Sequence, residues 1–154
     1  WLTYPSRQEL PLLAESAQAT LKDIGIDVDI NCTADNNSVV QDPAAWDVSA
    51  MANVQAPTGD PEYWFTVFAT SDATKNQGAY KNEKLDQLEE QLSQEFDTDK
   101  RAKLAVQMQQ TVLDDNAFVY CSFLKMSQIS RANVTGYMAH ACDYYQVTAD
   151  LDIN

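Results

Sequence analysis

The sequence predicts an α/β fold in a single domain of 154 residues. Residues 7–24 carry an apolar stripe at helical spacing, and the segments on either side, residues 1–4 and 26–30, have the composition of strands. A strand, a helix and a second strand within about 30 residues form a βαβ unit. We therefore expect parallel strands in a mixed sheet flanked by helices, with the first helix crossing one face of the sheet.

The first predicted helix, residues 7–24, has one apolar face. Its members are spaced by 3, 4, 4 and 3 residues: Leu10, Leu13, Ala17, Leu21 and Ile24. Ser6 is expected to cap its start in a capping box with Glu9, and Gly25 to end it in the left-handed conformation. Residues 26–30 alternate apolar and acidic side chains, as a strand with one buried face does.

Residues 31–43 are polar and are expected to form a loop, followed by a third strand at residues 46–54. One face of this strand would carry Trp46, Val48, Ala50 and Ala52. Residues 55–59 contain Pro and Gly and break the pattern. Asp60 followed by Pro61 predicts a helix start, because the carboxylate can accept free backbone N–H groups and Pro at the first position loses no hydrogen bond. The helix through residue 69 is rich in aromatic residues and should be buried or lie in an interface.

A second polar loop is expected at residues 71–81, followed by amphipathic helices at residues 82–96 and 99–113. Asp97 or Thr98 should cap the second of these helices. The apolar run at residues 118–124 predicts a strand buried on both faces. Residues 134–147 should contain further short extended pieces. No repeat or linker divides the sequence into two domains.

The chain is acidic, with 23 Asp and Glu against 10 Lys and Arg and a net charge of -13. Binding to phosphates or to an anionic membrane surface requires clustered cations, so nucleic acid and membrane partners are excluded. The sequence lacks an apolar stretch long enough to span a bilayer. It begins at once with a strand-like segment, and we expect it to be an excised piece of a longer protein.

Three cysteines, Cys32, Cys121 and Cys142, allow one disulfide in three alternative pairings or none. The single histidine, His140, stands two residues before Cys142. A zinc site assembled from these two residues and distant groups is the weaker alternative, since no metal-ligand spacing is present. A Cys–His catalytic pair is also the weaker alternative, because no oxyanion-hole turn accompanies it. We predict no catalytic residue, no metal site and no cofactor.

The loop at residues 53–59 is the best candidate for a ligand site. It leaves a predicted strand and enters a helix N-terminus, where open α/β sheets present ligand-binding groups. Asn53, Gln55 and Thr58 supply amide and hydroxyl groups suited to hydrogen bonding and not to bond breaking. The alternative is a plain connection between elements.

The order of motifs resembles the third domain of the family 5 extracellular solute-binding proteins, the dipeptide, oligopeptide and nickel receptors of bacterial ABC importers. The motifs are LTYPS at residues 2–6, ELPLLAE at 9–15, LKDIGIDV at 21–28, GDP at 59–61, YKNEKLDQL at 80–88, TDxR at 98–101 and VxGY at 134–137. The resemblance covers roughly residues 2 to 137. Each motif is weak alone, and their order and spacing are what is specific.

This resemblance implies that residues 1–154 form one lobe of a two-lobed receptor of the type II periplasmic-binding-protein kind, with solute held between lobes. It implies an extracytoplasmic, lipid-anchored monomer that works with an ABC permease and is not an enzyme. It also implies a cleft lined by six residues: Asn53, Val54, Gln55, Pro57, Thr58 and Asn76. An extracytoplasmic location would permit a disulfide.

The same resemblance bears on the solute. Peptide receptors of the family carry an Asp four residues before the motif proline, and here that position is Pro57. The pair Ala56 and Pro57 resembles the nickel branch, although the aromatic residue upstream of it is replaced by Val54 or Gln55. A histidine after the aromatic helix has no counterpart in residues 71–80. Peptide, chelated nickel and another small polar solute all stay open.

A second hypothesis is a non-catalytic structural or interaction domain. In that case Trp64 and Phe68, on the aromatic helix, would form an interface with another protein.

Overall fold

The computed structural model describes residues 1–125, 127–140 and 147–154. They form two compact units, the first made of Trp1–Asn53 and Lys75–Ala79 and the second of Val54–Thr74 and Tyr80–Asn154. Each unit combines helices with short strands, which confirms the predicted α/β class. In place of one mixed sheet, the described chain contains two small sheets, one parallel and one antiparallel. That residues 1–154 act as a single domain stays a prediction.

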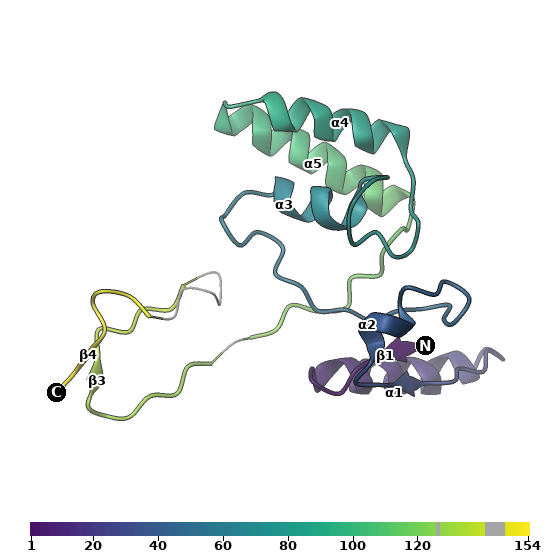
Figure 1. Cartoon of the computed structure of the whole chain (residues 1–154), viewed down its shortest axis with the longest axis horizontal. Helices are drawn as coiled ribbons and strands as arrows, with labels where there is room; N and C mark the ends of the chain where they lie inside the picture. The colour runs from purple at the N-terminus through teal and green to yellow at the C-terminus, as the bar shows by residue number, and fades with distance from the viewer. Residues whose placement is uncertain (126, 141–146) are drawn as a thin grey trace. The chain divides into compact units, whose positions relative to one another are not determined.

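The first unit is built on the βαβ element that the sequence predicts (Figure 1). Strand β1 (Leu2–Thr3) pairs in parallel with β2 (Asn31–Cys32), with Leu2 opposite Asn31, and helix α1 (Glu9–Lys22) connects the two. Leu10 and Ala14 on α1 are buried, together with Leu2 on β1. The parallel pairing and the crossover helix are therefore confirmed.

Helix α1 ends as predicted but begins differently. Gly25 has a φ of 82°. Its N–H donates to the Lys22 carbonyl at 3.0 Å and the Ile26 N–H donates to the Leu21 carbonyl at 3.0 Å, a Schellman motif. The capping box of Ser6 with Glu9 is wrong, because Gln8 precedes the first helical residue and no side chain caps it. Ser6 lies too far upstream to reach the free N–H groups.

The predicted strand at residues 26–30 is wrong in its position. Ile24 and Ile26 are exposed, and β2 begins at Asn31, inside the segment predicted as a loop. Asn31 donates its N–H to the Trp1 carbonyl at 2.8 Å, so β2 forms where the chain meets β1 and not where apolar residues alternate. The rest of the predicted loop contains the short helix α2 (Asn36–Val39).

The predicted third strand, residues 46–54, reduces to a single parallel bridge between Ser49 and Leu2. The Leu2 N–H donates to the Val48 carbonyl at 2.7 Å, and the Ala50 N–H donates to the Leu2 carbonyl at 2.9 Å. Asn31 and Ser49 thus both pair with Leu2, from opposite edges of β1. An extended segment was predicted here, and its length was overestimated.

The second unit starts with the aromatic helix. α3 (Glu62–Trp64) continues into a π-helical turn, η1 (Phe65–Ala69), in which the Thr70 N–H donates to the Phe65 carbonyl at 3.0 Å. The helix start at Asp60 and Pro61 is confirmed, since the Asp60 carboxylate accepts the Glu62 N–H at 2.9 Å. Phe65 and Phe68 are buried, as the aromatic content predicts.

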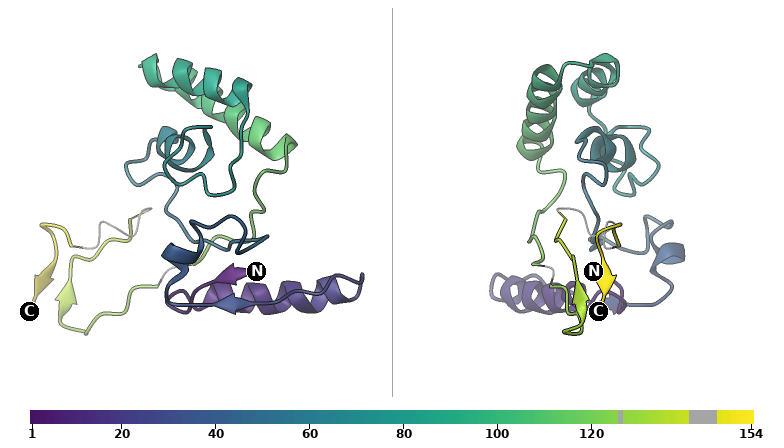
Figure 2. Two further views of the ribbon diagram at one scale, coloured as in Figure 1. Left: turned by 45° about the vertical axis from the view of Figure 1, so that its right-hand side comes forward. Right: turned by 90° about the vertical axis from the view of Figure 1, so that its left-hand side faces the viewer.

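Helices α4 (Glu83–Gln94) and α5 (Thr98–Asp114) form an antiparallel hairpin, and they lie side by side in every view (Figures 1 and 2). The Asn82 side chain accepts the Leu85 N–H, and the Asp97 side chain accepts the Lys100 N–H, so both caps satisfy free donors. The buried residues of α4 and α5 pack with the aromatic helix into one hydrophobic core. Its members are Phe65, Ala69, Leu85, Leu88, Leu92, Ala105, Met108 and Val112.

The strand predicted at residues 118–124 is wrong. The described residues give this segment no ladder partner, and Val119 and Phe123 are 88% and 81% exposed. Apolar composition alone does not make a strand, because an extended chain also needs a neighbour for its backbone hydrogen bonds. Further along, β3 (Val134–Thr135) pairs antiparallel with β4 (Asp152–Ile153), which confirms an extended piece in residues 134–147. The part of that prediction at residues 141–146, with Cys142, lies outside the described residues.

The aromatic helix does not present the interface of the second hypothesis. Phe68 is buried, and the Trp64 ring packs edge-on against Phe65 and Phe118, with ring centroids 5.3 Å apart in each case. The rings of Phe65, Trp64 and Phe118 belong to the hydrophobic core of the second unit or pack against it. In the part of the chain that the structure describes, no helix is both long and apolar enough to cross a membrane.

Candidate functional site

The predicted ligand loop ends in a tight turn of the second unit. The Gly59 N–H donates to the Ala56 carbonyl at 3.0 Å, and Gly59 has a φ of 83°, a left-handed conformation that favours glycine. Gln55 and Thr58 are exposed, so their amide and hydroxyl groups are accessible. Val54 and Pro57 are half-buried. The loop therefore presents polar groups beside partly covered apolar ones.

The six predicted site residues fall in both units. Val54, Gln55, Pro57 and Thr58 follow one another in the second unit, and the structure holds them together in one loop. Asn53 is exposed and Asn76 is half-buried, and both belong to the first unit. The Asn76 carbonyl accepts the Ala79 N–H at 3.2 Å, and Ala79 has a φ of 51°. The six residues as one binding site stay a prediction.

Asp60, at the end of this loop, has a second role beyond the helix start. Its two carboxylate oxygens accept from Nη2 of Arg101 at 2.8 and 2.7 Å. The same nitrogen lies 2.6 Å from the Glu62 carboxylate. Burial acts to raise the pKa of Asp60, but the Glu62 N–H and the Arg101 guanidinium outweigh it and hold that pKa below its usual range.

Arg101 comes from the first turn of α5 and also reaches the end of α4. Its Nη1 donates to the carbonyl oxygens of Leu92 at 2.7 Å and Glu95 at 2.8 Å. Hydrogen bonds to Glu62 and Asp60 raise the pKa of Arg101 above its usual value. The sequence indicates this residue only as part of the TDxR motif. Its pairing with Asp60 spans 41 positions, and no local pattern predicts such a contact.

A second polar cluster joins the start of α4 to the end of α5. Tyr80 Oη and Asn82 Nδ2 both donate to Asp115 Oδ2 at 2.6 Å. Burial, followed by the hydrogen bond to Asp115, raises the pKa of Tyr80 to about 12. The hydrogen bond from Tyr80, followed by that from Asn82, lowers the pKa of Asp115. This cluster ties the start of α4 to the end of α5.

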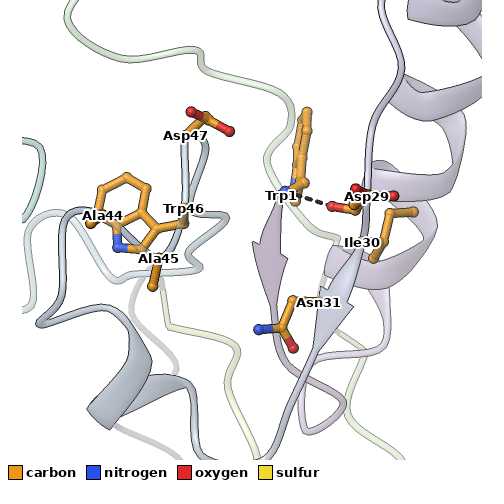
Figure 3. Close-up of a pocket in the computed structure, with 8 residues that line it drawn as sticks. All are labelled: Trp1, Asp29, Ile30, Asn31, Ala44, Ala45, Trp46 and Asp47. Carbon is orange, nitrogen blue, oxygen red and sulfur yellow. Dashed lines mark hydrogen bonds between the residues drawn. The ribbon is translucent and has the colours of Figure 1, made fainter.

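The first unit contains a pocket of about 300 Å³ at the amino ends of β1 and β2 (Figure 3). Trp1 and Asn31 line one side of it, and Trp46 and Asp47 the other. The α-amino group of Trp1 donates to the Asp29 carbonyl at 2.7 Å. Open α/β sheets bind ligands at the carboxyl ends of their strands, and none of the six predicted site residues lines this pocket.

The alternatives built on cysteine and histidine gain no support. Cys32 and Cys121 are exposed and unpaired, and Cys142 lies outside the described residues, so the pairing of His140 with Cys142 does too. Within residues 1–125, 127–140 and 147–154, no three His, Cys, Asp or Glu side chains are grouped as a metal site. What the loop of the second unit offers is hydrogen bonding at exposed amide and hydroxyl groups.

Comparison with known proteins identifies relatives that are nickel-binding or ABC transporter proteins. No protein-family model matches the chain. The nickel-binding protein NikA of Staphylococcus aureus is 31% identical over 104 residues, which is 68% of this chain and 21% of that protein. The chain thus spans about a fifth of the length of this curated relative.

Solved structures agree on the fold. The structure of Staphylococcus aureus NikA in complex with Ni(L-His)2 matches with a TM-score of 0.82 at 24% identity, over 99% of this chain and 33% of that one. A nickel ABC transporter protein from Bacillus halodurans matches with a TM-score of 0.67 at 30% identity, over 75% of this chain and 24% of that one.

A third solved structure extends the comparison beyond nickel proteins. The ABC transporter substrate-binding protein CtaP from Listeria monocytogenes gives a TM-score of 0.61 at 26% identity, over 74% of this chain and 24% of that one. The resemblance found in the sequence motifs is thereby confirmed. The chain is homologous, over part of their length, to the nickel-binding protein NikA and to the substrate-binding proteins of ABC transporters.

Proposed function

We propose that this chain is part of the solute-binding receptor of an ABC importer and that it forms one of two lobes that close on the solute. The observation that carries the proposal is its 31% identity over 104 residues to a nickel-binding protein. A chain that spans 21% of such a relative supplies only some of the solute contacts. The remaining contacts would come from the other lobe of the same receptor.

The solute we propose is a nickel chelate, with a small peptide as the alternative. A chelated metal shows the protein the carboxylate oxygens and N–H groups of its chelator, so its receptor needs hydrogen-bonding groups more than metal ligands. Asn53, Gln55, Thr58 and Asn76 are groups of this kind, and Val54 and Pro57 would contact the apolar parts of the chelator. The NikA structure with Ni(L-His)2 gives a concrete chelate to test.

The receptor would work outside the cytoplasmic membrane, as a monomer that delivers solute to a cognate permease. The family likeness supports this location and this partner, since ABC transporter substrate-binding proteins are among the relatives. The abundance of acidic residues, 23 against 10 basic ones, agrees with the absence of a nucleic acid partner. A receptor of this kind binds its solute and does not transform it.

The test is solute binding by the receptor that contains this chain. Calorimetric titration with Ni(II) and L-histidine should show saturable binding, and a dipeptide titration tests the alternative solute. Gln55→Ala and Thr58→Ala should each weaken affinity about three- to tenfold, the equivalent of one neutral hydrogen bond. Matched controls are Gln91→Ala on α4 and Thr20→Ala on α1, both exposed and both bonded only to their own helix.

The outcomes separate the possibilities. Saturable nickel–histidine binding that the loop variants weaken and the controls do not would support the proposal. Saturable dipeptide binding with no response to nickel would identify a peptide as the solute and would still support the role as a solute receptor. No binding of either solute would contradict the proposed function.

A further inference from the structure

We propose that Arg101 is a positioning residue of the solute site. It does not touch the solute, but it fixes the turn at Asp60 and thereby holds residues 54–59 in the conformation that binds. This inference rests on the proposed function, because it names the residue that prepares the proposed binding loop.

Residues 54–59 are anchored at Asp60, which follows them in the sequence. In the described chain, the backbone hydrogen bond we find for residues 54–59 is the one from Gly59 to Ala56. A segment with so few bonds is ordered mainly by its ends. Asp60 is the residue at the carboxyl end, and its carboxylate is held at 2.8 and 2.7 Å by Arg101 and at 2.9 Å by the Glu62 N–H. Thr58 stands only two residues before this anchor.

Helix α5, which carries Arg101, is held in the core of the second unit. Arg101 lies one helical turn before Ala105, which is buried in the core with Met108. Its Nη1 is also bonded to the carbonyls of Leu92 and Glu95 at the end of α4. The guanidinium is therefore fixed by two packed helices before it meets Asp60. Sites supported by helices keep a more precise geometry than sites supported by loops.

The hydrogen bonds of Arg101 use all the donors of its terminal nitrogens. A guanidinium has two N–H groups on each terminal nitrogen. Nη1 serves two carbonyl oxygens, and Nη2 serves three carboxylate oxygens of Asp60 and Glu62. The Arg101 side chain is only 18% exposed. No terminal donor is left for a solute, so any effect of Arg101 on binding passes through the groups that it holds, of which Asp60 is the one adjoining the loop.

Loss of Arg101 should change the rate of solute association and not the overall stability of the fold. The Asp60 side chain is 43% exposed, and an ion pair so open to solvent contributes little to overall stability. The ion pair between Asp60 and Arg101 instead affects the conformation of residues 54–59. If the loop samples several conformations without Arg101, the apparent affinity falls by the fraction of molecules that are competent to bind. The association rate then falls, whereas loss of a direct contact raises the dissociation rate.

The experiment compares Arg101→Gln with Lys100→Gln in the receptor that contains this chain. Both variants remove one positive charge from the first turn of α5, but Lys100 forms an exposed ion pair with Glu95, at 3.6 Å, and no ion pair with Asp60 or Glu62. Stopped-flow kinetics with nickel–histidine, and with a dipeptide as second probe, give association and dissociation rates. We expect Arg101→Gln to slow association about tenfold at an unchanged dissociation rate, as ordering of a mobile loop predicts. Lys100→Gln should leave both rates unchanged.

Two further variants, Arg101→Lys and Asp60→Asn, test the same pairing between Arg101 and Asp60. Arg101→Lys keeps the charge but reaches fewer acceptors, and it should restore part of the association rate. Asp60→Asn keeps an oxygen for the Glu62 N–H and weakens the pairing with Arg101, and it decides the matter if Arg101→Gln does not fold. Amide hydrogen exchange of the unliganded receptor should become faster in residues 54–62 of both variants that weaken the pair.

Each outcome has one meaning. Wild-type rates in folded Arg101→Gln or Asp60→Asn would overturn the inference and leave the proposed function intact. A raised dissociation rate at unchanged association would also overturn it, in favour of direct contact. If the wild-type receptor binds neither probe, the proposed function itself fails and this inference falls with it.

Discussion

Replacement of Leu85 by alanine tests the hydrophobic core on which the second unit depends. Leu85 is 0% exposed and belongs to the cluster that joins α4 and α5 to the aromatic helix. The change removes three carbon groups, at about 0.8 kcal/mol each, or roughly 2.4 kcal/mol of transfer free energy. The cavity left behind adds to this, and large-to-small changes in packed cores cost about 2–5 kcal/mol in total. We expect a loss of about 3 kcal/mol in the free energy of unfolding.

The assay is urea unfolding followed by far-UV circular dichroism, which reports the helices α1, α4 and α5. Leu12→Ala is the matched control, because Leu12 lies on α1 and is 64% exposed. Its free energy of unfolding should change by less than about 0.5 kcal/mol. A loss below about 1 kcal/mol for Leu85→Ala, at an unchanged dependence on urea concentration, would refute the packing described for α4 and α5.

Two further predictions follow from the polar groups of the second unit. Asn82→Ala should cost about 1–2 kcal/mol of unfolding free energy, since it removes the cap that accepts the Leu85 N–H at 3.0 Å and the exposed hydrogen bond to Asp115 at 2.6 Å. An equal loss for the exposed Ser93→Ala would show that these two bonds are not the cause. In an alkaline absorbance titration Tyr80 should ionise at a higher pH than an exposed tyrosine, because its pKa is raised to about 12. A raised pKa of an acid means that the neutral form is favoured in the folded state, so the stability contributed by Tyr80 should be present below about pH 10 and lost as pH rises toward 12. Tyr80→Phe should remove that pH dependence, and its persistence would contradict the assignment.

The helical half of the fold was predictable because its signals are local. Leu85, Leu88 and Leu92 repeat at spacings of 3 and 4, and all three are buried on α4. Asp97 precedes such a stripe and caps α5, as expected, and Asn82, where the first of these helices was predicted to start, caps α4. Gly25 ends α1 for the same kind of reason, since the left-handed conformation of a helix end favours glycine.

The strands were predicted less well because pairing is not a local property. Residues 26–30 alternate as a strand should, yet β2 forms at Asn31 and Cys32, where the backbone meets β1. The run at residues 118–124 is apolar enough for a buried strand, but composition does not supply a hydrogen-bonding partner. β4 was not predicted, because a strand of two residues, Asp152 and Ile153, is too short to show an alternating pattern.

The candidate site was also predictable only where its signals are local. The turn at Gly59, Asp60 and Pro61 has residue types that dictate their conformation, and it was predicted together with the loop before it. Arg101, which binds Asp60, was not predicted as a partner because the two residues are 41 positions apart. A contact of that range depends on the packing of the aromatic helix against α4 and α5, which sequence spacing does not specify.

The most direct test of the account is a crystal structure of the receptor that contains this chain, solved with its solute bound. The account predicts the solute within hydrogen-bonding distance of Gln55 or Thr58, with Arg101 still bonded to Asp60 and not to the solute. A solute bound elsewhere, with residues 54–58 facing only solvent, would contradict it.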